Sequence, residues 1–141
     1  ILRGLVGSEM CIRDRFETES HTGSPIYHTD VLMYVGTTAI GICYEVIKPE
    51  YRDLVKKRVE RFHDVIEIKK EQLLNFCGNC LEIPDKDGNL LLAMSTAAFN
   101  AYTELQKEKI EKHFKKIVHT DISTIEKYGG GSARCMLAEL F

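Results

Sequence analysis

The chain has 141 residues, of which 44% are hydrophobic and 28% are charged, and its formal net charge is −2 at pH 7. This composition fits one folded domain and excludes an intrinsically disordered chain, which would combine few hydrophobic residues with a high net charge. A near-neutral charge offers no basic field to nucleic acid, and the longest uncharged apolar run, residues 31–44, is shorter than the roughly 20 residues that span a bilayer, so we expect neither a nucleic-acid partner nor a membrane segment.

The N-terminal residues do not follow a pattern that is typical of a folded protein. Residues 1–15 show neither helical nor alternating periodicity, and they resemble translated sequencing-adapter read-through. We therefore expect residues 1–23 to be a non-native or disordered segment. We expect residues 24–141 to be the C-terminal part of a larger domain.

Four elements are predicted in the first half of the remaining chain. Residues 25–35 and 39–47 are rich in β-branched and aromatic residues and are separated by a short turn, which predicts a hairpin of two strands. A helix with one apolar face is predicted to begin at Pro49. Residues 64–68 alternate as a short strand, and residues 71–76 fit a short helix.

The same order recurs in the second half. Two strands are predicted at residues 80–83 and 90–94, a helix at 95–114, a strand at 116–119 and a short helix at 121–128. A repeated unit of this size indicates modules that pack against one another. The pattern thus predicts an α/β fold, followed by one more strand in the last nine residues.

Two residues stand out as candidates for chemistry. Cys135 follows three glycines at the start of the last predicted strand, where a side chain can point into a cleft; the alternative is a buried core cysteine. His28 lies on the first predicted strand, and the alternative for it is an ordinary strand histidine. A cysteine and a histidine that meet in the fold form a reactive pair, but their spacing in the sequence does not show that they meet.

The other cysteines carry weaker signals. Cys77 and Cys80 have the C-x-x-C spacing of thiol oxidoreductases, but such a motif follows a strand and opens a helix, whereas here a helix is predicted before it and a strand after it. A structural zinc site needs four ligands, and no second pair accompanies these two. We therefore expect no metal. Because the five cysteines are odd in number and lie in apolar segments, we expect reduced thiols and a cytoplasmic location.

Three motifs together resemble a known superfamily. They are IYHTDVLMYVGT at 26–37, FCGNCLEI at 76–83 and YGGGSARCMLAELF at 128–141. In this order they resemble the guanidine-group-modifying enzymes, the pentein superfamily of arginine deiminases, dimethylarginine hydrolases and amidinotransferases, and most of all the citrulline-hydrolase branch of the amidinotransferase family. The resemblance implies a partial five-bladed α/β propeller, with about two ββαβ blades plus a closing strand.

The resemblance also implies roles for individual residues. Cys135 would be the nucleophile, and His28 the acid that protonates the leaving amine and then activates water. Asp30 would accept a hydrogen bond from a substrate nitrogen; because the citrulline branch often carries asparagine there, Asp30 leaves open whether the substrate is arginine-like or citrulline-like. Since strand side chains alternate, His28 and Asp30 are expected on one face of the first strand.

Three further residues have two readings each. Gly131 would shape the loop that carries Cys135, or simply belong to a helix cap. Arg134 would bind a substrate carboxylate, or lie exposed at a strand end. Asn79 is interpreted as a turn residue that positions the backbone rather than as a catalytic one.

The function implied by the resemblance is hydrolysis of a guanidino or ureido C–N bond of a small citrulline-type or arginine-type substrate through a covalent cysteine intermediate, with no cofactor. Transfer of the amidino group to an amine acceptor is one alternative, and a catalytically inactive interaction module built on the propeller scaffold is another. The remaining catalytic carboxylates of the superfamily belong to upstream blades. We therefore expect the 141-residue chain by itself to be inactive.

Overall fold

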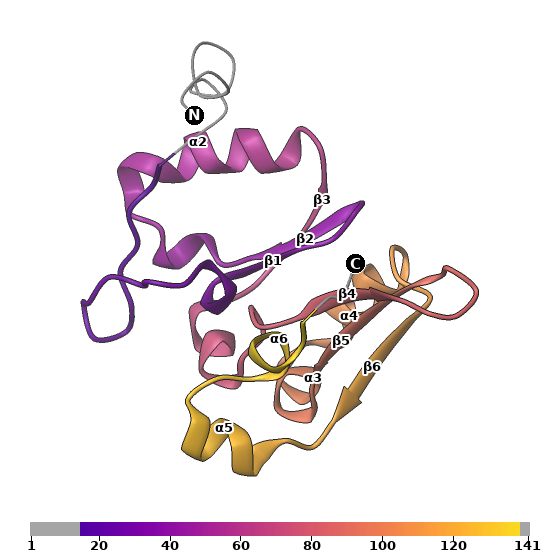
Figure 1. Cartoon of the computed structure of the whole chain (residues 1–141). Coiled ribbons are helices and arrows are strands. Elements are labelled where there is room, and N and C mark those ends of the chain that lie inside the picture. Colours follow the sequence, from indigo (N-terminus) through magenta and orange to yellow (C-terminus); the bar gives the residue numbers. More distant parts are fainter. Residues whose placement is uncertain (1–14, 139–141) are drawn as a thin grey trace, which may run out of the picture.

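The computed structural model describes residues 15–138, which form two consecutive units, each built on a three-stranded sheet (Figure 1). In the first unit β1 pairs with β2 in antiparallel fashion, and β2 pairs with β3 in parallel fashion. The connection from β2 to β3 runs through helix α2. The bounds of these elements are β1 (Met33–Val35), β2 (Ala39–Ile42), α2 (Pro49–Glu60) and β3 (Asp64–Glu67).

The second unit repeats this arrangement. Its sheet has the order β4, β5, β6, again with one antiparallel and one parallel pair. The bounds are β4 (Leu81–Pro84), β5 (Leu90–Ser95), α3 (Thr96–Ala101), α4 (Glu104–Glu111) and β6 (Lys116–Thr120). The predicted order of strand, strand, helix and strand is therefore confirmed in both halves of the chain, as is the mixed α/β class.

The burial of the central strands explains why their sequences are apolar throughout. All four residues of β2 are buried, as are the last four of β5. A strand that is covered on both faces shows a continuous apolar run, and a parallel pair needs a crossover such as a helix. The two central strands contribute to one hydrophobic core that contains, among others, Ile42, Ile66, Leu92, Ile110 and Phe114.

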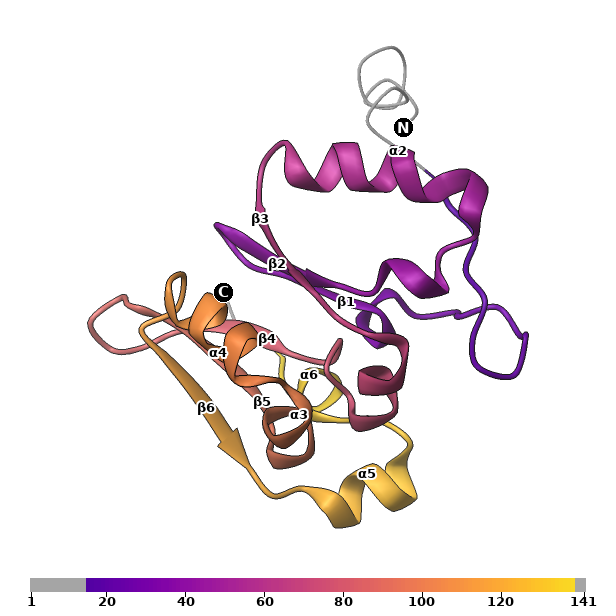
Figure 2. The same cartoon turned by 180° about the vertical axis from the view of Figure 1, so that it is seen from behind.

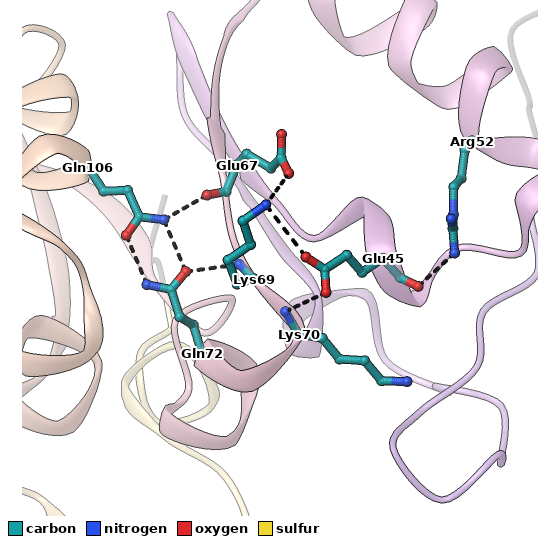
Figure 3. A network of polar contacts seen from close by, with 7 residues as sticks. All are labelled: Glu45, Arg52, Glu67, Lys69, Lys70, Gln72 and Gln106. Atoms are coloured by element: carbon teal, nitrogen blue, oxygen red, sulfur yellow. Dashed lines mark hydrogen bonds and ion pairs between the residues drawn. The ribbon is translucent and has the colours of Figure 1, made fainter.

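Two glutamine side chains connect the units at the surface of this core (Figure 3). Gln106 of α4 donates from Nε2 to the carbonyl oxygen of Glu67 at 2.7 Å and to Oε1 of Gln72 at 3.0 Å. Gln72, on the 3-10 helix η4 (Lys70–Asn75), donates from Nε2 to the carbonyl oxygen of Ala101 at 2.7 Å and to Oε1 of Gln106 at 2.8 Å. The second unit is thus held against the end of β3.

The first predicted strand is much shorter than expected. Residues 25–32 do not belong to a strand: Thr29–Val31 form the 3-10 helix η2, and β1 begins at Met33. Met33 pairs with Ile42, the last residue of β2, and the chain then turns into the 3-10 helix η3 (Tyr44–Val46). Earlier residues therefore have no strand partner, and the expectation that His28 and Asp30 share a strand face is wrong.

The long helix predicted at 95–114 is divided into α3 and α4. Tyr102 has an extended backbone, and its buried hydroxyl donates to the carbonyl oxygen of Cys77 at 2.6 Å. Thr103 then caps α4: its hydroxyl accepts from the Gln106 amide, and the Gln106 side chain accepts from the Thr103 amide. This capping box is readable as T-x-x-Q, and it starts a new helix where one was expected to continue.

The structure also corrects the prediction of a closing strand. After α5 (Ser123–Gly129), residues Ala133–Met136 form the short helix α6, and residues 139–141 lie outside the described part of the chain. Helix α6 packs on the face of the second sheet opposite to α3 and α4, as Figures 1 and 2 show. Its backbone forms hydrogen bonds within a helical turn and with residue 79.

The part of the predicted N-terminal segment that the structure describes, residues 15–23, contacts the first unit. Thr18 forms a β-bridge with Ile47, and Lys48 pairs with Glu17. These contacts place residues 17–19 with the folded part of the chain, on the N-terminal side of the boundary predicted at residue 24; residues 1–14 lie outside the described residues. Among the helices of residues 15–138, none is long and apolar enough to cross a membrane.

Candidate active site

The three sequence motifs meet at one place, where η2, the loop before β4 and helix α6 come together. The thiol of Cys135 donates to the Oδ2 atom of Asp30, with a sulfur–oxygen distance of 3.3 Å. The side-chain amide of Asn79 donates to the Cys135 sulfur at 3.3 Å. Each of these residues comes from a different motif, and Asp30 and Cys135 are 105 positions apart in the sequence.

Asn79 lies at the centre of this cluster. Its Nδ2 atom donates to the backbone oxygen of Asp30 at 3.2 Å and to the Asp30 carboxylate at 3.3 Å, in addition to the sulfur. Its Oδ1 atom accepts from the backbone amide of Arg134 at 3.0 Å. The residue is 4% exposed, whereas Cys135 is exposed and Asp30 is half-buried. The candidate nucleophile Cys135 is therefore exposed to solvent, and the side chain that contacts it, Asn79, is buried.

Gly78 allows the loop before β4 to approach η2. A β-carbon at residue 78 would lie 2.3 Å from the carbonyl oxygen of Val31 and 3.0 Å from the carbonyl carbon of Leu32. No larger residue fits here unless the backbone moves. The Gly78-Asn79 pair in FCGNCLEI thus has a physical explanation: glycine permits the close approach, and asparagine uses it to reach Asp30.

We expect Gly78→Ala to destabilise the protein by about 2 to 3 kcal/mol, because the added methyl group overlaps backbone atoms that cannot rotate away. The control is Gly129→Ala, whose β-carbon would meet the Ile125 side chain at an ordinary 3.6 Å. Its effect is expected to stay within about 0.5 kcal/mol. Chemical unfolding followed by circular dichroism measures both; equal stabilities of the two variants would contradict the close approach at residue 78.

Helix α6 presents Cys135 at its second-to-last position. Ser132 precedes the helix, and its hydroxyl donates to Oε1 of Glu126 at 2.6 Å, which ties α6 to α5. Gly131 lies directly against Cys135, since a β-carbon there would be 3.2 Å from the sulfur. This contact fits the loop-shaping reading of Gly131. The left-handed residue that ends α5 is Gly130.

His28 lies close to Asp30 in the sequence, but it is not part of the hydrogen-bonded cluster of Asp30, Asn79 and Cys135. It is the residue before η2, it is exposed, and Asp30 follows two positions later. Among residues 15–138, no hydrogen bond or ion pair joins the side chains of His28 and Cys135. The structure thus brings the side chains of Asp30 and Cys135 into contact and does not join His28 to them by a hydrogen bond.

Arg134 is exposed and, together with Asp30, lines a depression of about 340 Å³. Its backbone amide donates to Asn79, and Cys135 is not among the residues that line this depression. Larger depressions lie elsewhere. One of about 480 Å³ lies between β3 and α4, and its lining includes neither Asp30 nor Cys135. The contacts of Cys135 with Asp30 and Asn79, and not the size of a depression, therefore define the candidate site.

The C-x-x-C cysteines are structural. Cys77 and Cys80 are buried, and burial raises the pKa of the Cys77 thiol to about 12. Burial, followed by the proximity of Cys77, raises the pKa of Cys80 well above its ordinary value. Such thiols stay protonated and unreactive. Within residues 15–138, no group of three or more histidine, cysteine, aspartate and glutamate side chains is arranged to hold a metal ion.

The model of the eukaryotic N,N-dimethylarginine dimethylhydrolase family matches residues 14–141. A comparison with curated protein sequences gives no significant match.

Three solved structures of one cyanobacterial protein share the fold. The N-terminal domain of ArgZ, an arginine dihydrolase from the ornithine-ammonia cycle in cyanobacteria, bound to product, aligns with a TM-score of 0.59 and 20% identity over 77% of this chain and 36% of that chain. A cysteine-to-serine variant bound to substrate gives a TM-score of 0.59 at 19% identity with the same coverage. An asparagine-to-serine variant, covalently bonded to a reaction intermediate, gives 0.59 and 20% with the same coverage. The chain thus spans about a third of that domain.

Proposed function

The chain belongs to the eukaryotic N,N-dimethylarginine dimethylhydrolase family, and from this premise we propose that the complete protein hydrolyses a guanidino C–N bond through a covalent intermediate on Cys135. The superfamily resemblance that the three motifs predicted is confirmed by this membership and by the shared fold. The observation that carries the proposal is the contact of the exposed Cys135 thiol with the Asp30 carboxylate, supported by Asn79.

The charge at this site favours an arginine-type substrate over a citrulline-type one. Asp30 places a carboxylate 3.3 Å from the sulfur. A guanidinium cation bound next to both groups pairs with the carboxylate, and its positive charge also favours the thiolate form of Cys135. A neutral ureido group gains neither interaction. Arg134, which lines one depression together with Asp30, would pair with the carboxylate of the substrate.

The reaction proceeds in two halves. In the first, the Cys135 thiolate attacks the guanidino carbon, a C–S bond forms, and the C–N bond to the departing nitrogen breaks while protonated His28 supplies the proton that this amine takes. In the second, water attacks the same carbon and gives a proton to His28, and the C–S bond breaks, which returns the thiolate and the protonated His28 and releases a ureido product. An amine in place of water would give amidino transfer instead.

The two ββαβ units would be two blades of a five-bladed propeller, and the other blades would supply the remaining carboxylates. This is consistent with the share of the cyanobacterial domain that the chain covers. The 141-residue chain alone is then inactive, because a guanidinium held by Asp30 alone is poorly oriented. A cytoplasmic location stays a prediction from cysteine usage.

The direct test is to incubate the complete protein with arginine, N,N-dimethylarginine or citrulline, and to measure released ammonia or dimethylamine together with the carbon product. We expect amine release and a ureido product from at least one guanidino substrate and none from citrulline. Release from citrulline alone would overturn the substrate class, and release from none of the three would overturn the hydrolase. Ammonia release by the 141-residue chain would contradict its predicted inactivity.

A further inference from the structure

We propose that Asn79 is a positioning residue, whose side-chain amide holds the Asp30 carboxylate and the Cys135 thiol at contact distance. The proposal deepens the proposed function and rests on it for its catalytic consequence. Sequence reasoning assigned Asn79 to a turn. The structure gives its side chain a place between the two groups that the chemistry needs.

The orientation of the Asn79 amide is fixed by its surroundings. Its Oδ1 side faces a backbone N–H, that of Arg134, at 3.0 Å, which is a donor. Its Nδ2 side faces the carbonyl and carboxylate oxygens of Asp30 and the sulfur of Cys135, which are acceptors at 3.2 to 3.3 Å. A reversed amide would place oxygen against oxygen on one side and N–H against N–H on the other. One orientation therefore satisfies every partner.

Asn79 also replaces the ordinary cap of helix α6. The first turn of a helix has free N–H groups that a side chain at the preceding residue usually accepts. Ser132 stands at that position, but its hydroxyl is engaged with Glu126. The Asn79 Oδ1 atom bonds the Arg134 amide instead. The turn that presents Cys135 is thus anchored by a residue 56 positions away.

This arrangement affects the thiolate form of Cys135. The Asp30 carboxylate next to the sulfur opposes a negative charge there, whereas the Asn79 N–H stabilises it, since a hydrogen bond to a charged acceptor is stronger than one to a neutral acceptor. Asn79 also donates to the Asp30 carboxylate and spreads part of its charge. Removal of the donor while the oxygen is retained should therefore slow reactions of the thiolate without releasing α6.

The substitution Asn79→Asp makes this change with little change in shape. In the 141-residue chain, we measure the rate at which iodoacetamide alkylates Cys135 at pH 8, by mass spectrometry of the peptide that carries it. The new carboxylate faces both Asp30 and the sulfur, so we expect alkylation about tenfold slower. The matched control is Asn89→Asp, in the loop between β4 and β5, where the rate should stay within about twofold of the wild type.

Thermal unfolding shows whether Asn79→Asp is folded. A cooperatively folded variant with an unchanged alkylation rate would overturn the proposal. Because this assay requires no turnover, it remains informative if the complete protein proves not to be a guanidino hydrolase.

A second variant keeps the proposal testable if Asn79→Asp does not fold. In the complete protein, Asn79→Ala should lower kcat by about 10- to 100-fold when the rate is divided by the amount of folded enzyme, because the nucleophile is less well held. The crystal structure of this variant should show the Cys135 sulfur and Asp30 Oδ2 separated by about 1 Å more than in the wild type. An unchanged kcat per folded enzyme with the 3.3 Å contact intact would refute the assignment.

Discussion

Replacing Cys135 with alanine in the complete protein is expected to lower kcat by about 10⁴-fold or more, because the covalent route loses its nucleophile. The free energy of unfolding should change by less than about 1 kcal/mol, since the side chain is exposed and its polar contacts are with Asn79 and Asp30. Steady-state amine release and chemical unfolding measure the two quantities. A large loss of stability would instead favour the core-cysteine reading.

Cys43→Ala is the matched control for this experiment. Cys43 is fully buried and packs in the hydrophobic core, so its truncation should cost about 1 to 2 kcal/mol of stability and leave turnover per folded molecule unchanged. Loss of Cys135 is thus expected to affect turnover, and loss of Cys43 is expected to affect stability. Loss of turnover in a folded Cys43→Ala variant would show that the assignment of the reactive cysteine is wrong.

Replacing His28 with alanine is expected to lower kcat by about 10³-fold, because general acid–base catalysis contributes roughly 10² to 10⁴ in rate. Without a proton donor, the amine must leave as an anion or wait for a proton from solvent. The matched control is His21→Ala, a second exposed histidine in the same part of the chain, which should change kcat by less than about twofold.

Product release as a function of substrate concentration separates two roles for His28. A general acid–base role lowers kcat, whereas a role in substrate binding would raise KM at constant kcat. Since a general acid–base role requires His28 to reach the departing nitrogen, we expect the complete protein to bring the imidazole over the substrate. A kcat equal to that of the wild type would contradict this expectation.

The order of elements could be predicted from the sequence, and the reason is burial. Continuous apolar runs mark β2 and β5 because helices and neighbouring segments cover them on both sides. The lengths of the edge elements could not be predicted in the same way. The segment before Met33 is rich in strand-forming residues, yet β2 offers it no further partner, and strand propensity acts only where a partner strand exists.

The site was predicted in part. Cys135 and Asp30 were identified from the motifs, and the structure brings their side chains together. The central place of Asn79 could not be read, because it depends on which backbone amide its oxygen meets, and that amide belongs to α6, a segment expected to be a strand. One signal was available: glycine is typical of places where the backbone closely approaches another group, and Gly78 allows such an approach.

The most direct test of the covalent role of Cys135 is mass spectrometry of the complete protein, mixed with a guanidino substrate and quenched with acid during turnover. We expect the peptide that carries Cys135 to gain the mass of the substrate less the released amine, and the Cys135→Ala variant to show no such gain. Turnover without any adduct on this peptide, or with an adduct on another cysteine, would contradict the account.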